Sequence, residues 1–361
     1  MTQLKTKIKA QAKKYCFIIC SLVAICLLYK MATFNQVIYA DNKPAQPRKF
    51  AVKEIPAPPA VPTEESLKKL QTISILGWNV ENLFEAEVKK NSLPKYNGAD
   101  RNIKHVKQKL YNITDVLRRV NKGYGADIIG LCEVENKNIL NEIANHPNLQ
   151  PLQYKYQYLI PGQDFRNINV ALLSRYPAVK TEAKLMYPGG RTILMGKFNI
   201  HNHMLYVIVN HWRSQIGGEN KTEHFREQAA KVCYKMVKQI LQEDANADIV
   251  LVGDFNEVST GKAVSQALGA TLYKGSISNA KLYNLTHSIK WAPWVNVKDS
   301  FDQIILSRGL FDKKGFSYKQ NSFKIISFKF QCNAQGYPLV FSPKDGHGYS
   351  DHFPVFCELT F

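Results

Sequence analysis

The run Asp248-Ile249-Val250-Leu251-Val252-Gly253-Asp254-Phe255-Asn256-Glu257 decides the fold of this chain. Its four consecutive aliphatic residues predict a strand buried on both faces, and Gly253 marks the end of that strand. Alternation along the strand sends Asp254 and Asn256 to the same side, at a rigid strand end suited to holding reacting groups. A carboxylate and an amide there can orient water, accept a proton or donate to an anionic oxygen. Taken alone, the same residues also fit a strand end closed by an Asx turn.

Strand-like and helical stretches alternate on both sides of this run. We expect strands at residues 73–78, 127–132, 170–173 and 205–209, and helices at residues 104–120 and 223–242. Residues 196–200 and 204–209 flank the polar turn His201-Asn202-His203, which predicts an antiparallel hairpin rather than a histidine-type nuclease motif. Hairpins of this kind favour two mixed sheets packed face to face with helices outside.

The N-terminus predicts a targeting segment. Residues 1–14 hold five lysines, and the apolar run 15–29 that follows is short for a membrane span but typical of a signal sequence. We expect export, with residues 1–40 acting as a cleaved signal peptide or as an uncleaved signal anchor that contacts the membrane. Residues 41–65 contain six prolines and predict an extended linker to a domain that spans residues 66–361.

Positive charge is in excess over the whole chain. The formal net charge is +19, and residues 1–40 contribute six lysines and no acid, so residues 41–361 keep a net charge of 19 less 6, or +13. Such an excess favours polyanions, either nucleic acid or an anionic membrane surface, and also serves solubility. We expect nucleic acid as the substrate and a monomeric protein.

Lysines interleave with aromatic residues between residues 308 and 330. This pattern predicts a strand pair whose aromatic face packs while its lysines face solvent. Two interpretations stay open: a solvated hairpin, or a track for a phosphate backbone that leads into the site. The lysines concerned are Lys313, Lys314, Lys319, Lys324 and Lys329.

Cysteine usage does not suggest a metal or redox motif. Three of the seven cysteines lie in the N-terminal segment, and the others, Cys132, Cys233, Cys332 and Cys357, form no Cys-x-x-Cys pair. We expect core residues, with one disulfide permitted in an oxidising compartment.

Six stretches place polar side chains at the ends of predicted strands. Each has an ordinary structural explanation by itself, such as a strand-end charge or a turn residue. Together they supply oxygen ligands for a hard divalent cation, two histidines for proton transfer and carboxylates to orient them, which metal-assisted phosphodiester hydrolysis requires. The stretches are Trp78-Asn79-Val80-Glu81-Asn82, Gly130-Leu131-Cys132-Glu133, Asn210-His211-Trp212-Arg213-Ser214, Gly253-Asp254-Phe255-Asn256, Ser300-Phe301-Asp302-Gln303 and Ser350-Asp351-His352.

The ordered set of these motifs resembles the endonuclease/exonuclease/phosphatase superfamily, which includes the deoxyribonuclease I-like enzymes, over residues 72–361. The resemblance implies an α/β fold, a four-layered α/β sandwich of two packed mixed β-sheets flanked by helices, with the site at one edge of the sheets. It also implies a divalent-metal-dependent phosphodiester hydrolase. Together with the N-terminal targeting segment and the basic charge, this leads us to expect an exported nuclease that acts on DNA or RNA. The implied cofactor is Mg²⁺, with Mn²⁺ or Ca²⁺ as alternatives.

The resemblance assigns a metal site and a catalytic histidine. Asn79, Glu133 and Asp351 correspond to the residues that hold the divalent cation in the family. His352 matches the catalytic histidine, and Asp302 matches the carboxylate that orients it. In physical terms Asp302 fixes the tautomer of His352 and stabilises its protonated form.

Further residues are implied for the attacking water and the second histidine. Asp254 and Asn256 match the pair that positions water and phosphate, and His211 matches a second catalytic histidine. Relatives often carry an acid where this chain has Asn169, so a carboxylate partner for His211 is not identified from the sequence.

Substrate contacts are expected from three motifs. Asn82 closes the first polar stretch, and Arg213 and Ser214 follow His211, where they can bind a phosphate. Arg226, on the next helix, is either a second phosphate ligand or a structural ion-pair partner.

Two other functions are weighed against a nuclease. A lipid or small-molecule phosphodiesterase or phosphatase, sphingomyelinase-like or phosphoinositide phosphatase-like, shares the same motifs. A lipid-acting enzyme usually shows an exposed apolar hairpin, for which only residues 291–295 qualify. A binding module without activity is disfavoured because every core position keeps its chemistry.

Overall fold

The computed structural model describes residues 55–60, 62–63, 65, 72–87, 100–278, 281–289, 292–293, 295–296 and 299–361. Contacts divide the chain after Ile55, and the fold described here is the unit from Pro56 to Phe361. The expected signal segment and most of the expected linker lie outside the described residues. Within the described residues no helix has both the length and the apolar character needed to cross a membrane.

Two mixed β-sheets of seven strands each form the centre of the described part of the chain. The first has the order β12-β14-β1-β2-β4-β3, with β13 also paired to β14, and the second has the order β5-β6-β7-β8-β11-β10-β9. The first sheet contains β1 (Thr72–Leu83), β2 (Ile128–Val134), β3 (Tyr156–Leu159), β4 (Asn169–Ser174), β12 (Ser317–Tyr318), β13 (Lys324–Ile325) and β14 (Val355–Thr360). The second contains β5 (Ala178–Leu185), β6 (Thr192–Ile200), β7 (His203–His211), β8 (Asp248–Asp254), β9 (Ala270–Thr271), β10 (Leu282–Asn284) and β11 (Asp302–Leu306).

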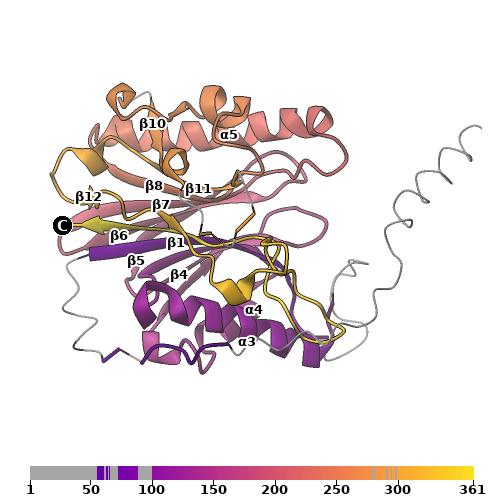
Figure 1. Ribbon diagram of the computed structural model, residues 1–361. Coiled ribbons are helices and arrows are strands. Elements are labelled where there is room, and N and C mark those ends of the chain that lie inside the picture. Colours follow the sequence, from indigo (N-terminus) through magenta and orange to yellow (C-terminus); the bar gives the residue numbers. More distant parts are fainter. Residues whose placement is uncertain are drawn as a thin grey trace, which may run out of the picture. The chain divides into compact units, whose positions relative to one another are not determined.

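Helices form the two outer layers. Helices α3 (Ile103–Arg119) and α4 (Lys137–Ala144) cover the outer face of the first sheet, and α5 (Glu219–Glu243) covers the outer face of the second (Figure 1). Short helical turns complete the chain: η1 (Val120–Gly123), η2 (Gln150–Leu152), the π-helical η3 (Ala263–Ala267), η4 (Lys274–Ser276), η5 (Leu285–Ser288), η6 (Gly309–Phe311) and η7 (Lys329–Gln331). The expected four-layered α/β sandwich is confirmed.

Alternation along the strands explains how the layers hold together. In β1, Ile73 and Ile75 enter the core between the sheets, whereas Leu76 and Trp78 pack under α3 and α4. In β8, Val250 and Val252 face the core between the sheets, and Ile249 and Leu251 pack under α5. Both faces of each central strand are therefore buried, which is why these strands read as continuous apolar runs.

Strand directions bring several strand ends to one edge. In the first sheet β1 and β2 are parallel, with antiparallel β14 beside β1 and antiparallel β4 beside β2. In the second sheet β7 and β8 are parallel, with antiparallel β6 and β11 on either side. The carboxyl ends of β1, β2, β7 and β8 therefore lie with the amino ends of β11 and β14, at the edge that holds the polar motifs.

Gly77 sets how closely the two sheets approach. A Cβ atom at this position of β1 would lie 2.3 Å from Val252 Cγ2 in the facing sheet, closer than real Cβ contacts. Glycine is therefore required where β1 crosses β8.

The predicted strands and helices are confirmed, as is the hairpin. Strands β6 and β7 pair antiparallel, and His201 and Asn202 form the connecting turn with φ angles of 54° and 66°. Cys132, Cys233 and Cys357 are buried core residues, as predicted. One part of the expected linker contacts the domain, which was not predicted. The carbonyl of Pro56 accepts a hydrogen bond from Arg119 Nη1 (2.5 Å).

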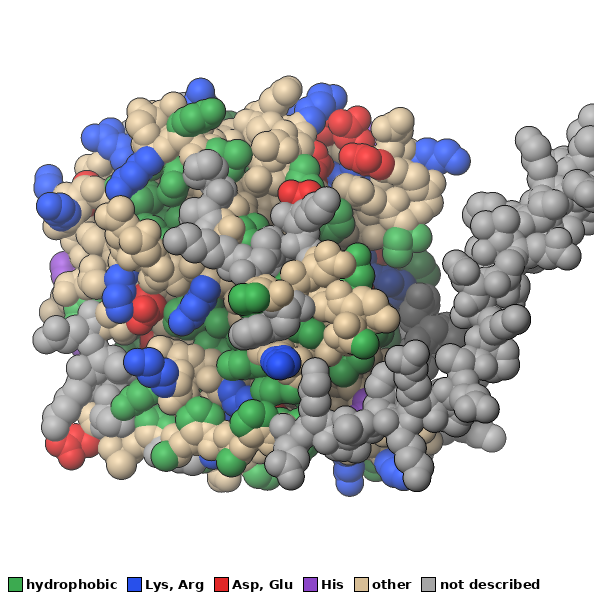
Figure 2. All heavy atoms as spheres, in the orientation of Figure 1, with side chains coloured by type: hydrophobic (Ala, Val, Ile, Leu, Met, Phe, Trp, Pro, Cys, Tyr) green, Lys and Arg blue, Asp and Glu red, His purple; other side chains and the backbone are tan. Residues whose placement is uncertain are grey.

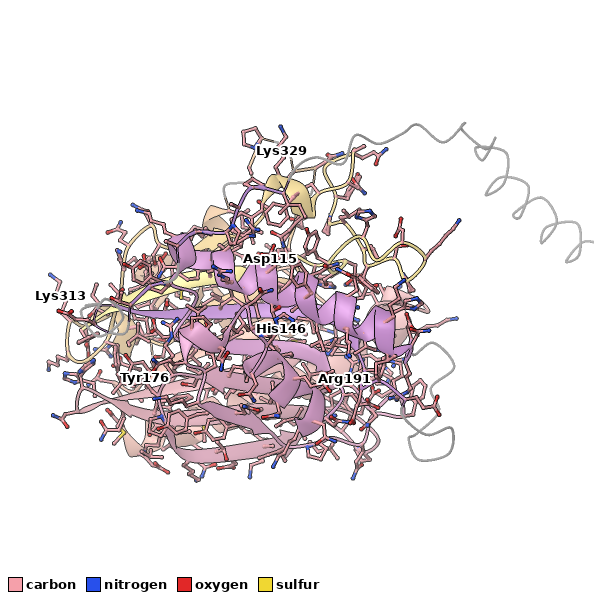
Figure 3. The ribbon with its side chains drawn as sticks, turned by 90° about the horizontal axis from the view of Figure 1, so that it is seen from below. Asp115, His146, Tyr176, Arg191, Lys313 and Lys329 are labelled. Carbon is pink, nitrogen blue, oxygen red and sulfur yellow. The ribbon has the colours of Figure 1, made fainter. Side chains whose placement is uncertain are left out.

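The structure places two lysines of the expected track away from the site. After β11 the chain has run to the far end of the second sheet, where Phe316 N donates to Asp248 Oδ2 (2.9 Å). Asp248 begins β8 and Asp254 ends it, and a strand of this length separates its ends by about 20 Å. Lys313 and Lys314 precede Phe316 and so lie at the opposite end from the polar motifs. Figure 3 places Lys313 at one end of the molecule and Arg191, which contacts the site, at the other.

The predicted strand pair between residues 308 and 330 also differs from the structure. The two-residue strands β12 and β13 each pair with β14 instead of with one another. Lys319 forms an exposed ion pair with Glu358 (3.0 Å). On the face shown in Figure 2, Lys and Arg side chains are scattered and do not form one continuous patch.

Candidate active site

The site continues the residue rows that face the core between the sheets. Asn79, His211, Asp254 and Asp302 have the same parity as the inward-facing residues of β1, β7, β8 and β11. In the second sheet Asp254 is the register partner of both His211 and Asp302, so three functional side chains lie side by side on adjacent strands. Asn79 Nδ2 donates to Asp254 Oδ2 (3.0 Å) and thereby links the two sheets.

Glu133 reaches the site through a break in the alternation. Its parity in β2 would direct it outward, but its φ is 67° and the register with β4 shifts at this point. Its Oε2 accepts from Asn82 N (2.7 Å), and its Oε1 lies 3.4 Å from Asn79 Nδ2 and 3.5 Å from His211 Nε2. Positive φ angles also occur at Glu81 (51°), Asn82 (49°) and Asn256 (49°), and such strain concentrates at functional sites.

Asp254 and Asn256 face the same side, as predicted, and also form the Asx turn. Asn256 N donates to Asp254 Oδ1 (2.8 Å), and Asn256 Nδ2 donates to Asp254 Oδ2 (3.0 Å) and to the carbonyl of Trp212 (3.1 Å). The turn itself therefore positions both side chains. Burial raises the pKa of Asp254 to about 6, although the positive charge of His352 opposes the shift.

His352 and Asp302 form a close pair. His352 Nδ1 lies 2.5 Å from Asp302 Oδ2, and His352 Nε2 lies 3.7 Å from Asp351 Oδ1 and 3.9 Å from Asp254 Oδ2. Burial alone would lower the pKa of the His352 imidazole, but the carboxylates of Asp302 and Asp254 outweigh it and raise that pKa well above its usual value. His352 is thus an imidazolium at neutral pH, with Nε2–H directed away from Asp302.

The segment that carries His352 is anchored to β1. Ser350 Oγ donates to the carbonyl of Asn79 (2.6 Å), and His352 N donates to Ser350 Oγ (3.1 Å). Trp78 Nε1 donates to the carbonyl of His352 (2.9 Å). These bonds explain why tryptophan and serine accompany the reactive residues in their motifs.

His211 is buried and neutral. Burial, with the positive charges of Arg191 and Arg166, lowers the pKa of His211 well below its usual value. Its Nε2 faces Glu133 and Asp254 (3.6 Å to Asp254 Oδ2), and its Nδ1 has no hydrogen-bond partner among the described residues.

Asn169 does not serve His211. Its amide donates to the carbonyl of Glu135 (2.7 Å) and accepts from Gly162 N (2.8 Å). The carboxylates near His211 are those of Glu133 and Asp254, both on the Nε2 side.

The expected substrate ligands divide into two groups. Arg213 is half-buried and its Nε has no partner within the described part of the chain, while Ser214 Oγ accepts from Ile216 N (3.2 Å) and keeps its own proton to donate. Arg226 is 1% exposed, and its Nε donates to Glu257 Oε2 (2.9 Å). Arg226 is therefore the structural ion-pair partner, and its assignment as a substrate ligand is wrong because the guanidinium is enclosed and already paired.

A model of the endonuclease/exonuclease/phosphatase family matches residues 74–360. The chain belongs to this family. It is therefore a hydrolase of phosphoester bonds. No curated protein matches the chain in sequence.

Solved structures with the family fold agree with this assignment. A humanised D. rerio TDP2 superposes with a TM-score of 0.51 at 14% identity, covering 81% of this chain and 100% of its own. The mannosyl-6-phosphatase of Bacteroides thetaiotaomicron superposes with a TM-score of 0.51 at 15% identity, covering 80% and 100%. At these identities the similarity establishes the fold alone.

Enzymes of the endonuclease/exonuclease/phosphatase family generally depend on a divalent metal, and the donor set here fits a hard cation. Glu133 and Asn79 offer carboxylate and amide oxygens, the ligands that Mg²⁺ takes together with water. Burial raises the pKa of Glu81 to about 7; the nearby charge of Lys109 opposes this shift, and repulsion from Asp351 and Glu133 adds to it. Among the described residues no three His, Cys, Asp or Glu side chains group closely enough to hold a metal ion by themselves. Asn79 and Glu133 contact one another, and Asp351 lies beside His352.

Several residues beside this family site were not singled out from the sequence. Arg166 Nη2 lies 3.7 Å from Glu133 Oε1, and Arg191 Nη1 donates to the carbonyl of Trp212 (2.9 Å). Lys109 is buried next to Glu81, although both are charged residues. A usable signal existed for Lys109, because it occupies an apolar position of α3, three residues after Val106 and four before Ile113.

Proposed function

We propose that this protein is an exported, divalent-metal-dependent phosphodiesterase, a nuclease that acts on DNA or RNA. The observation that carries this proposal is the meeting of the His352–Asp302 pair, Asp254 and Glu133 at one sheet edge, which provides an acid, a base and oxygen ligands for a cation within one site.

Asp254 is proposed as the base that activates the attacking water. It accepts hydrogen bonds from Asn79 and Asn256, which hold its carboxylate in place. With its pKa raised to about 6, it is ionised at neutral pH yet basic enough to take a proton from water in the transition state.

His352 is proposed as the acid. Its Nε2 lies 3.9 Å from Asp254 Oδ2, so the two side chains face one small region of the site, and a phosphoryl oxygen bound beside His352 can accept from the imidazolium. The proton on Nε2 can stabilise and then protonate the departing oxygen, while Asp302 keeps the opposite side of the ring fixed.

Negative charge on the phosphate needs hydrogen-bond donors. His211, neutral and buried, can donate to a phosphoryl oxygen, and the Nε of Arg213 has no protein partner among the described residues. A divalent cation at Glu133 and Asn79, with Asp351 as a further candidate ligand, would neutralise the developing charge when bound.

Nucleic acid is favoured by the net charge of +13 on residues 41–361 and by the arginines around the site. A small-molecule phosphoester is the second candidate, because the small cavity described in the next section suits a single small group better than a duplex. Export is proposed from the basic and apolar N-terminal segment, which on this proposal contacts the membrane transiently or as an anchor. The protein is proposed to act as a monomer.

The test measures hydrolysis by the purified full chain in the presence of Mg²⁺. The substrates, each in a separate reaction, are plasmid DNA, RNA, sphingomyelin and bis-p-nitrophenyl phosphate. We expect cleavage of a polynucleotide and of the chromogenic diester, and we expect none with His352→Ala as the matched control. Cleavage of sphingomyelin without cleavage of DNA or RNA would overturn the nuclease proposal.

A further inference from the structure

A cavity of about 130 Å³ lies beside the site, between the end of β1, the start of α3 and residues 341–343. Its walls include Glu81, Asn82, Lys109 and Phe341, and we call it the Lys109 pocket. The pocket adjoins the proposed metal site at Glu133 and Asn79, because the backbone N–H of Asn82 donates to Glu133 Oε2 (2.7 Å). A group attached to a phosphate at that site can therefore reach it.

Lys109 brings an under-used donor to this pocket. The residue is 7% exposed, and its Nζ donates to the carbonyl of Glu81 and lies 5.3 Å from the centroid of the Phe341 ring. An ammonium group carries three N–H donors, and among the described residues that carbonyl is its one hydrogen-bond acceptor. Burial lowers the pKa of Lys109, as expected for a cation short of partners.

Two acceptors complement this donor. Glu81 Oε2 and Asn82 Oδ1 are buried, and neither has a hydrogen-bond partner in the described part of the chain. Buried polar atoms are rarely left unsatisfied without a functional reason. The pocket therefore offers one donor and two acceptors, which suits a ligand that can both accept and donate hydrogen bonds.

The pocket holds carboxylates as well as an ammonium group, which argues against an anionic ligand. Lys109 faces Glu81, and His105 Nδ1 lies 2.9 Å from Asp100 Oδ2. A phosphate would meet the two carboxylates as well as the ammonium. Hydroxyl groups are neutral and each can donate and accept, so they suit a carboxylate beside an ammonium. The remaining walls, including Phe84 and Phe341, are apolar and suit the C–H faces of a ring.

We propose that the Lys109 pocket binds the sugar ring that carries the phosphate ester, and that it selects a ring with two neighbouring hydroxyls. One hydroxyl accepts from Lys109 Nζ and the other donates to Glu81. The inference rests on the proposed function, since it needs a phosphoester bound at the Glu133 corner. Either the 3′-terminal ribose of an RNA chain or a free sugar phosphate presents this chemistry, because an internal ribose of RNA has its 3′ oxygen in the phosphodiester and keeps one free hydroxyl.

The test compares substrates that differ in one hydroxyl, using the full chain with Mg²⁺. The pairs are RNA against DNA of the same sequence, and ribose 5-phosphate against 2-deoxyribose 5-phosphate. We expect kcat/KM to favour the hydroxylated member of at least one pair by about tenfold or more, since a site built to bond a hydroxyl discriminates against its absence. Preference in the first pair identifies a ribonucleotide, and preference confined to the second identifies a sugar phosphate.

Variants of the pocket should reduce this ratio. In Glu81→Gln, which keeps the side-chain shape, and in Lys109→Met we expect the preference to fall to within about threefold of unity. Lys107→Met, at an exposed position of the same helix, is the matched control and should keep the wild-type ratio. Thermal unfolding of each variant shows whether it folds, and Glu81→Gln carries the test if Lys109→Met does not.

Two results would overturn the inference. One is a wild-type ratio near unity in both pairs, and the other is a loss in the variants that is equal for both members of a pair, which indicates a structural role only. If no phosphoester is hydrolysed at all, the proposed function fails by itself. Calorimetric binding of ribose 5-phosphate against 2-deoxyribose 5-phosphate then decides the pocket, with equal affinities counting against it.

Discussion

Replacing Asp302 by asparagine should remove the charge that keeps His352 protonated. The change preserves the side-chain shape at a position 2.5 Å from His352 Nδ1, in a buried environment. With an effective dielectric constant of about 20, two unit charges about 4 Å apart attract by about 4 kcal/mol, which corresponds to about 3 pKa units. Asp254 and Asp351 remain near the ring, so we expect the pKa of His352 to fall by about 1 to 3 units.

The consequence for catalysis follows from the roles of the two groups. The pH profile of kcat/KM should rise through about 6 as Asp254 ionises and fall where His352 loses its proton, well above the usual histidine range. In Asp302→Asn the alkaline limb should move toward lower pH. The maximal rate should fall by about 10² to 10⁴, since an asparagine also presents the wrong hydrogen-bonding group to the ring.

Two measurements check this expectation. The first is the pH profile with bis-p-nitrophenyl phosphate, and the second is an NMR titration of the His352 ring, which does not depend on turnover. Asp115→Asn is the control, because it removes a buried carboxylate that pairs with Arg119 on α3 and not with His352. An alkaline limb and a ring pKa that both move by less than about half a unit would refute the assignment of Asp302.

Three further outcomes are expected. Exhaustive EDTA treatment should abolish hydrolysis and Mg²⁺ should restore it, and activity that survives EDTA would contradict the metal corner at Glu133. His352→Ala and Asp254→Asn should each lower turnover at least about a hundredfold with an unchanged circular dichroism spectrum, so a variant that keeps a tenth of the rate speaks against its role. Burial raises the pKa of Asp248 to about 7, so its folded form holds a proton that the unfolded chain releases near pH 4, and stability falls as pH rises between these values. Asp248→Asn should therefore raise the free energy of unfolding by about 1 to 3 kcal/mol at pH 8 and hardly at pH 4, and equal effects at both pH values would exclude this cause.

Much of the fold and the site follows from local patterns that the sequence displays openly. Apolar runs such as residues 249–252 mark central strands because both faces of those strands are buried. Parity then places Asn79 and Asp254 on facing sides of the two sheets, and the structure joins them by a hydrogen bond. Each of these steps depends on residues close together in the chain.

Other features depend on contacts that no local pattern reveals. Glu133 enters the site through a positive φ angle that opposes its parity, and a sequence gives no sign of that bulge. Lys313 and Lys314 lie between two site motifs in the chain, yet β11 carries the chain to the other end of the sheet before they occur. Arg226 follows a phosphate-binding motif, but its partner Glu257 is fixed by the packing of α5 on the second sheet.

Gly77 links the packing of the protein interior to the geometry of the active site. The reactive groups are divided between the two sheets, so the separation of the sheets sets the distance from Asn79 to Asp254. A larger side chain near the crossing of β1 and β8 would push the two sheets apart, because close-packed interiors move rather than compress. Substitutions remote from any substrate can then impair turnover while the protein stays folded, and the evolutionary freedom of this core is limited by catalysis as well as by stability.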